Sequence, residues 1–105
     1  MGIGIDIVDV RRIKDPERFA DGVLSPRERL IFNDRKDQIA FLAGRFAAKE
    51  AFMKAMGRGL GSIALREIEV LYRGLNQAPY ISYHDVDYDV SIAHDGDYAV
   101  AVVCI

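Results

Sequence analysis

The first residues of the chain alternate between large apolar side chains and small or polar ones. Isoleucine occupies every second position from residue 3 to residue 7, with Gly4 and Asp6 between them. A period of two is typical of a β-strand, because successive side chains point to opposite faces. The pattern predicts an N-terminal strand that carries Asp6 on the face opposite the isoleucines.

Three helix starts follow this strand. Asp15 precedes a proline, which is the arrangement of an N-cap and the first helical position. Ser25 and Glu28 have the spacing of a capping box. Asp37 is the candidate N-cap of a longer helix, which we expect to end at about Met56.

The second half of the chain has the pattern of strands. Four short segments are rich in β-branched and aromatic residues, at 67–73, 79–83, 88–93 and 97–104. Asp95-Gly96 is a tight-turn dipeptide that indicates an antiparallel hairpin, and Cys104 is expected to be buried in the last strand. These elements predict an α+β fold, in which the N-terminal strand and helices, including one long central helix, pack on a C-terminal antiparallel sheet.

Length and composition limit the kind of protein. With 105 residues, we expect one domain spanning 1–105. Half of the residues are hydrophobic and 29% are charged, as in ordinary globular proteins. No apolar run approaches the ~20 residues that span a bilayer, and the start lacks the features of a signal peptide. A single cysteine excludes an internal disulfide, so we expect a cytoplasmic protein without a membrane segment.

Charge is distributed unevenly along the chain. Residues 11–36 contain eight Lys or Arg and five Asp or Glu, so this segment is +3 while the remainder is −5. The overall balance argues against general nucleic-acid binding. The basic segment is either a solvated helix surface or a surface for an acidic partner.

Residues 41–61 (FLAGRFAAKEAFMKAMGRGLG) place charges inside an apolar helix. Apolar residues surround Glu50 and also occupy the opposite face, so burial on more than one side is expected. In one interpretation, Glu50 and Lys54 form a surface ion pair, and Arg45 and Lys49 are flanking charges. In the other, Glu50 binds a metal or acts as a base in a pocket, and Lys54 neutralises a nearby phosphate.

Glycine recurs after this helix, at Gly57, Gly59 and Gly61. Gly57 has the position of a helix C-cap glycine. Three alternating glycines also allow backbone N–H groups to approach a phosphate closely, although the loop is not a Walker A motif. The loop is therefore a candidate phosphate site.

Three segments, taken in order, resemble the holo-acyl-carrier-protein synthase family, the small single-domain branch of the 4′-phosphopantetheinyl transferases. They are residues 2–8 (GIGIDIV), 41–61 and 91–103 (SIAHDGDYAVAVV), and F-x-x-K-E-x-x-x-K in the middle segment is the most specific. The resemblance implies transfer of 4′-phosphopantetheine from coenzyme A to a serine of an acyl carrier protein, with adenosine 3′,5′-bisphosphate released. It also implies Mg²⁺ as cofactor, a role in fatty acid biosynthesis and a homotrimer with active sites between protomers. The alternative is a non-catalytic coenzyme A-binding module.

The same resemblance implies roles for individual residues. Asp6 and Glu50 would ligate the metal, and Glu50 and Lys54 would be catalytic. Arg45 and His94 would contact the coenzyme A nucleotide and Lys54 the transferred phosphate, and the glycine pattern adds Gly57, Gly59 and Gly61. The carrier protein would dock on Arg12, Arg18 and Phe19, to which the basic cluster adds Arg11 and Lys14. On chemical grounds, Glu50 is the first candidate for the general base and Asp6 the second. The chain departs from the family pattern at Ala93, where the family usually has a hydroxyl side chain, and before Pro79, where it often has a basic residue.

Overall fold

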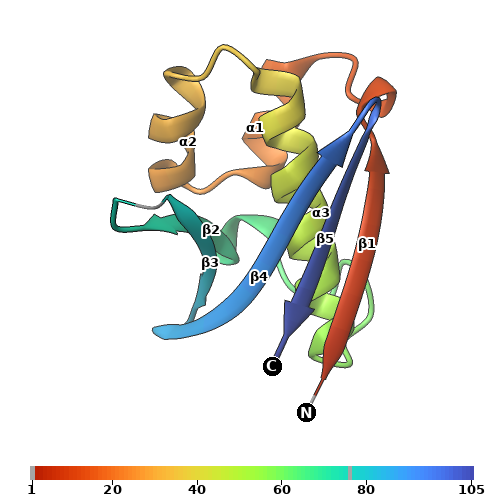
Figure 1. Ribbon diagram of the computed structural model, residues 1–105, viewed down its shortest axis with the longest axis vertical. Coiled ribbons are helices and arrows are strands. Elements are labelled where there is room, and N and C mark those ends of the chain that lie inside the picture. The colour runs from red at the N-terminus through yellow and green to blue at the C-terminus, as the bar shows by residue number, and fades with distance from the viewer. Residues whose placement is uncertain (1, 76) are drawn as a thin grey trace.

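The computed structural model describes residues 2–75 and 77–105. Within them, three α-helices pack on a five-stranded antiparallel sheet (Figure 1). In chain order the elements are β1 (Ile3–Asp9), the 3-10 turn η1 (Val10–Arg12), α1 (Pro16–Val23), α2 (Pro26–Asn33), α3 (Gln38–Ala55), the 3-10 turn η2 (Leu65–Glu67), β2 (Glu69–Arg73), β3 (Ala78–Tyr83), β4 (Val86–Asp95) and β5 (Tyr98–Cys104). The predicted α+β class, with its long central helix, is confirmed.

The strands are ordered β1-β5-β4-β3-β2, so the N-terminal strand lies beside the last one. Gly2 and Ile105 exchange two backbone hydrogen bonds of 2.9 Å, which hold the two ends of the chain together. Helix α3 packs chiefly against β1 and β5, while α1 and α2 lie toward one end of the molecule (Figure 1).

Strand β1 has the two faces that its alternating sequence predicts. Gly4 and Val8 are buried against α3, and Asp6 lies on the same side. The three isoleucines point the other way and are 58–66% exposed. Alanines fill the inner side of α3, at positions 43, 47, 48, 51 and 55, all at most 7% exposed. Small residues on both elements allow the strand and the helix to pack closely.

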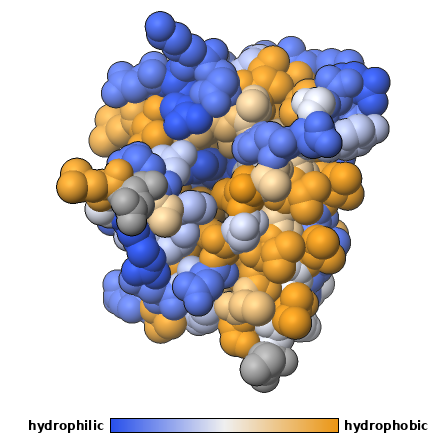
Figure 2. Space-filling model, in the orientation of Figure 1, coloured by the Kyte–Doolittle hydropathy of each residue, from blue (hydrophilic) through white to orange (hydrophobic). Residues whose placement is uncertain are grey.

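The outward face of β1 continues as an apolar surface across the sheet (Figure 2). Tyr98 and Val102 of β5 are 43% and 37% exposed beside the isoleucines of β1. We call the isoleucines at 3, 5 and 7 together with Tyr98 and Val102 the apolar sheet face. Its extent exceeds the scattered apolar residues of an ordinary surface, which indicates an interaction surface.

The helix starts agree with the sequence signals, with one difference. Asp15 accepts a backbone hydrogen bond in the first turn of α1, and Ser25 and Glu28 form a complete capping box. Asp37 precedes α3 as expected, but its side chain does not cap the helix. Its carboxylate pairs with Arg35 at 2.7 Å instead. Met56 is the C-cap residue of α3.

The predicted strands and hairpin are present, with shifted ends. The first predicted segment, 67–73, starts as the turn η2, and β4 is longer than the predicted 88–93. The β4–β5 hairpin is confirmed, and Gly96 has the positive φ of +57° that its turn requires. The expectation that Cys104 is buried was wrong. Alternation in β5 buries Ala99, Ala101 and Val103, which leaves Cys104 outward and exposed.

None of the helices in residues 2–75 and 77–105 is both long enough and apolar enough to cross a membrane.

Candidate active site

Asp6 and Lys54 meet where β1 lies against α3. The Lys54 ammonium donates to Asp6 Oδ1 at 3.1 Å and to the backbone carbonyl of Ile5 at 3.0 Å. Glu50 lies one helical turn before Lys54, on the same side of α3. The structure therefore brings together the strand carboxylate, the helix carboxylate and the lysine that the sequence analysis singled out.

Lys54 does not pair with Glu50. Among residues 2–75 and 77–105, the only ion pair of Lys54 joins it to Asp6, and none involves Glu50. The interpretation of Glu50 and Lys54 as an ordinary i,i+4 surface pair is therefore wrong. A partner 48 residues away in sequence has replaced the local one.

Glu50 is the unsatisfied member of this group. Its Oε2 atom is buried and has no hydrogen-bond partner. Burial raises the pKa of Glu50, and the negative charge of Asp6 raises it further, while Lys54 and Arg12 act in the opposite direction. A buried unpaired oxygen of Glu50 beside a second carboxylate, that of Asp6, forms a site that a cation would stabilise.

The carboxylate oxygens of Asp6 and Glu50 suit a Mg²⁺ site that substrate completes, rather than a site made of protein ligands alone. Across the described part of the chain, no cluster of three or more His, Cys, Asp or Glu side chains could hold a metal. Mg²⁺ is usually held by one or two carboxylates, with phosphate oxygens and water as its other ligands. The pair therefore suits an ion that is shared with a phosphate-bearing substrate.

Arg45 and His94 share a second cavity, of about 180 Å³, between α3 and the sheet. The Arg45 guanidinium lies 4.0 Å from the centre of the Phe41 ring and 4.8 Å from that of Tyr72. Its Nε atom is buried without a partner, and burial lowers the pKa of Arg45. His94 Nε2 lies 3.0 Å from the carbonyl oxygen of Ala40. The cavity has cationic, aromatic and apolar walls, and the carboxylate that also lines it, Asp37, is paired with Arg35. Such walls suit a nucleotide.

The two clusters do not converge within one chain. At 100° per residue, Arg45 and Glu50 lie roughly 140° apart around α3. The cavity of Arg45 and His94 is not lined by Asp6, Glu50 or Lys54. A single chain thus presents the two halves of the predicted site on different sides of its central helix.

The glycine loop begins as a helix cap. Gly57 has a φ of +69°, and the N–H groups of Gly57 and Arg58 donate to the carbonyls of Lys54 and Met53. This is the Schellman arrangement, which requires a residue with positive φ. Gly61 also has a positive φ, of +84°, whereas Gly59 does not. Backbone geometry explains two of the three glycines, and the space around Gly59 is open.

The basic segment divides into paired and unpaired charges. Arg11 is held by Asp9 at 2.7 Å and lies 3.7 Å from Asp97, so its charge is compensated locally. Within the described ranges, no ion pair involves Arg12, Lys14 or Arg18. Lys14, Arg18 and Phe19 line a shallow depression of about 330 Å³ beside the start of α1. Phe19 packs edge-on against Phe46 of α3, with ring centres 5.3 Å apart.

The sequence analysis missed a buried ion pair next to Glu50. Lys49 and Glu28 are both fully buried, and Lys49 Nζ lies 2.5 Å from Glu28 Oε1. Lys49 also donates to the carbonyl of Val23, while Glu28 accepts from the backbone N–H groups of Ser25 and Val70. Lys49 is therefore not an ordinary flanking charge. The capping-box position of Glu28 was the available signal.

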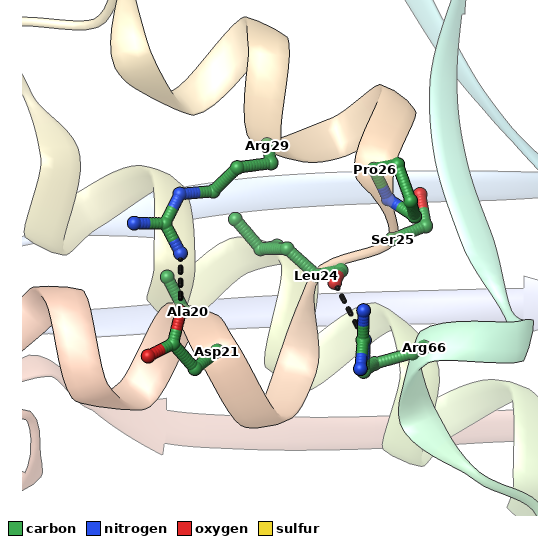
Figure 3. Close-up of a pocket in the computed structure, with 7 residues that line it drawn as sticks. All are labelled: Ala20, Asp21, Leu24, Ser25, Pro26, Arg29 and Arg66. Atoms are coloured by element: carbon green, nitrogen blue, oxygen red, sulfur yellow. Dashed lines mark hydrogen bonds and ion pairs between the residues drawn. The ribbon is translucent and has the colours of Figure 1, made fainter.

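Another cavity, of about 300 Å³, lies between α1, the start of α2 and η2 (Figure 3). Its charged groups are already engaged: Arg29 pairs with Asp21 at 2.7 Å, and Arg66 donates to the carbonyl of Leu24 at 3.3 Å. None of the predicted catalytic or metal residues lines it. We therefore assign no chemistry to this cavity.

Comparison with known proteins agrees with the geometry. Residues 2–103 match the family model described as "ACPS: 4′-phosphopantetheinyl transferase superfamily". The chain belongs to this superfamily. The resemblance stated from the sequence is thereby confirmed.

Relatives of this transferase family match along nearly the whole chain. The holo-[acyl-carrier-protein] synthase of Enterococcus faecalis is 45% identical over 112 residues, which cover 99% of this chain and 95% of that protein. The Bacillus anthracis synthase, solved in complex with CoA (3′,5′-ADP), superposes with a TM-score of 0.85 at 38% identity, covering 97% and 92% of the two chains. The Helicobacter pylori synthase, in complex with coenzyme A, has a TM-score of 0.82 at 32% identity and covers 97% of both chains.

Proposed function

We propose that this transferase moves 4′-phosphopantetheine from coenzyme A to a serine of an apo-acyl carrier protein and releases adenosine 3′,5′-bisphosphate. The observation that carries the proposal is the meeting of Asp6, Glu50 and Lys54 at the crossing of β1 and α3. Relatives named holo-[acyl-carrier-protein] synthase, two of them with structures in complex with coenzyme A or its nucleotide, support the substrates. The reaction would serve fatty acid biosynthesis in the cytoplasm.

Mg²⁺ would be held by Asp6 and Glu50, because the orphaned Oε2 of Glu50 and the nearby Asp6 carboxylate fit a hard cation. When bound, the ion would neutralise charge on the pyrophosphate group that is cleaved. In phosphoryl transfer, the protein chiefly positions groups and stabilises charge.

The chain's own residues supply positioning and proton transfer. Lys54, oriented by Asp6 and by the carbonyl of Ile5, can place its ammonium beside the phosphate that is attacked. Glu50 is the first candidate base for the serine hydroxyl and Asp6 is the second, since both carboxylates lie beside Lys54. Arg45 and His94 would bind the nucleotide end, and the loop with Gly57, Gly59 and Gly61 would pass near the phosphates.

A homotrimer would complete the site. The cavity of Arg45 and the carboxylate of Glu50 lie on different sides of α3. The cavity of one protomer can therefore bind the nucleotide of a coenzyme A molecule that reacts beside Glu50 of another protomer. The apolar sheet face offers a contact surface between copies. A rotationally symmetric ring uses such heterologous contacts and closes on itself.

The carrier protein would dock on the basic segment. Acyl carrier proteins are acidic, and Arg12, Lys14 and Arg18 offer charges that no ion pair within the described ranges compensates. Phe19 adds a partly buried aromatic surface beside them. Arg11 belongs to the same segment, but its pairing with Asp9 predicts a smaller contribution.

The test is direct conversion of a purified apo-carrier protein. The protein is mixed with coenzyme A, Mg²⁺ and the carrier, and intact-mass spectrometry should show one added phosphopantetheine group. Glu50→Gln should slow the addition at least about 100-fold, while Glu17→Gln, on an exposed residue of α1, should leave its rate unchanged. Binding of coenzyme A without any mass change would instead support a non-catalytic coenzyme A-binding module.

A further inference from the structure

Gly2 and Gly4 lie where β1 touches the backbone of α3. A Cβ atom added to Gly4 would lie 1.8 Å from the carbonyl oxygen of Ala51 and 2.7 Å from the amide nitrogen of Ala55. One added to Gly2 would lie 2.0 Å from the carbonyl oxygen of Ala55. These are backbone atoms, which cannot rotate away as a side chain does. The strand is therefore closer to the helix than any residue but glycine permits.

This close approach is in register with the site. Gly2, Gly4 and Asp6 occupy alternate positions, so all three face α3. The helix residues that they meet, Ala51 and Ala55, directly follow Glu50 and Lys54 in the chain. The Asp6 side chain is short, so its distance from Glu50 and Lys54 depends on the separation of the two backbones.

We propose that Gly2 and Gly4 are positioning residues whose missing side chains set the β1–α3 separation that lets Asp6 and Glu50 bind one divalent cation. The inference rests on the proposed metal site. A side chain at position 4 must move β1 away from α3 and carry Asp6 with it. Position 2 precedes the first residue of β1, Ile3, so the chain can yield there with a smaller displacement of Asp6.

Other positions provide matched controls. A Cβ atom at Gly22 of α1 would meet nothing within 4 Å, and its φ is not positive, so Gly22→Ala tests glycine replacement without a collision. Ile81 of β3 is fully buried and lies three strands away from β1. Ile81→Ala removes core volume and lowers stability without touching the site.

The experiment titrates Mn²⁺ into the full-length protein with coenzyme A present, because the site is completed by a phosphate-bearing substrate. Free Mn²⁺ is measured by electron paramagnetic resonance, coenzyme A without protein is the blank, and every variant is also melted thermally. Wild type should bind Mn²⁺, and Asp6→Asn should weaken binding. Gly4→Ala should weaken it by about 10–100-fold, the range seen when residues that orient metal ligands are lost. Gly2→Ala should weaken it less, and Gly22→Ala and Ile81→Ala should leave the affinity unchanged.

The possible outcomes separate this inference from the proposed function. If Asp6→Asn binds Mn²⁺ as wild type does, or wild type does not bind it, the metal site is wrong and the inference fails with it. If Asp6→Asn weakens binding but folded Gly4→Ala does not, only the role of the glycines is wrong. If Gly4→Ala does not fold, the Mn²⁺ affinity of Gly2→Ala becomes the test. A Gly2→Ala variant that binds Mn²⁺ as tightly as wild type would then refute the inference. Equal weakening by Ile81→Ala would show a general effect of lost stability and would also refute it.

Discussion

The buried pair of Glu28 and Lys49 should be one of the most sensitive points for stability. Lys49→Met removes the cation and leaves a buried carboxylate, with the carbonyl of Val23 also unpaired. Glu28→Gln leaves a buried ammonium and disturbs acceptors used by the N–H groups of Ser25 and Val70. Burial already lowers the pKa of Lys49, and Glu28 opposes that shift. Each charge is tolerated because the other is present.

The expected loss follows from the geometry. Removing one partner of a fully buried pair costs about 3–5 kcal/mol. A domain of this size has a free energy of unfolding of about 5–15 kcal/mol, so a single substitution removes a large part of it. Since 1 kcal/mol shifts the melting temperature of such a domain by roughly 4–8 °C, each single variant should melt roughly 12–40 °C lower.

The double variant makes the test specific. In Glu28→Gln/Lys49→Met neither charge is buried, so the loss should be smaller than the sum of the single losses by about 0.5–3 kcal/mol. Urea unfolding followed by circular dichroism measures the free energy of unfolding of the wild type, the two single variants and the double variant, which together form a double-mutant cycle. The exposed Arg35–Asp37 pair is the control, and Asp37→Asn should cost about 1 kcal/mol or less. Additive losses, or single variants as stable as wild type, would refute the reasoning.

Three further predictions concern function and assembly. Glu50→Gln should lower turnover at least about 100-fold and yet raise the melting temperature of the metal-free protein at pH 7. Because the pKa of Glu50 is raised in the folded protein, its ionisation above the ordinary pKa of 4.5 costs stability, and glutamine avoids that cost. An unchanged or lower melting temperature would contradict this. Arg12→Glu should raise KM for the carrier strongly at low salt and weaken coenzyme A binding little. Arg11→Glu, which also disturbs the Asp9 pair, should raise carrier KM less, and equal effects of the two variants would argue against this docking surface. Light scattering should give three times the chain mass of 11.7 kDa, and Ile5→Glu should yield smaller, inactive species; an active monomer would contradict the trimer.

Local signals account for the parts of the fold that the sequence predicted. A cap joins a side chain to backbone groups within one turn, so Asp15 and Ser25 could be recognised from their immediate neighbours. Alternation in β1 correctly separated Asp6 from the isoleucines. The same pattern does not reveal which strand β1 joins, and its pairing with β5 brings together residues from the two ends of the chain.

Long-range partners account for the errors at the site. The i,i+4 spacing of Glu50 and Lys54 predicts a local pair, but Asp6 and the carbonyl of Ile5 hold Lys54 instead. Lys49 has the sequence context of a flanking charge, and its partner Glu28 lies 21 residues earlier. An ion pair that closes across the fold has no periodicity for a sequence pattern to detect.

Lys49 and Glu50 are adjacent on α3 but have opposite environments, and this contrast supports the proposed role of Glu50 independently of the motif. Lys49 is fully buried with a carboxylate and a carbonyl as partners, so it can be explained by the fold alone. Glu50 retains a buried oxygen without a partner, and its charge is disfavoured by Asp6. An unpaired buried acceptor destabilises the protein, and such a cost is retained where a ligand relieves it. The F-x-x-K-E-x-x-x-K motif thus combines a lysine that the fold alone explains with a carboxylate and a second lysine for which we propose a role in the reaction.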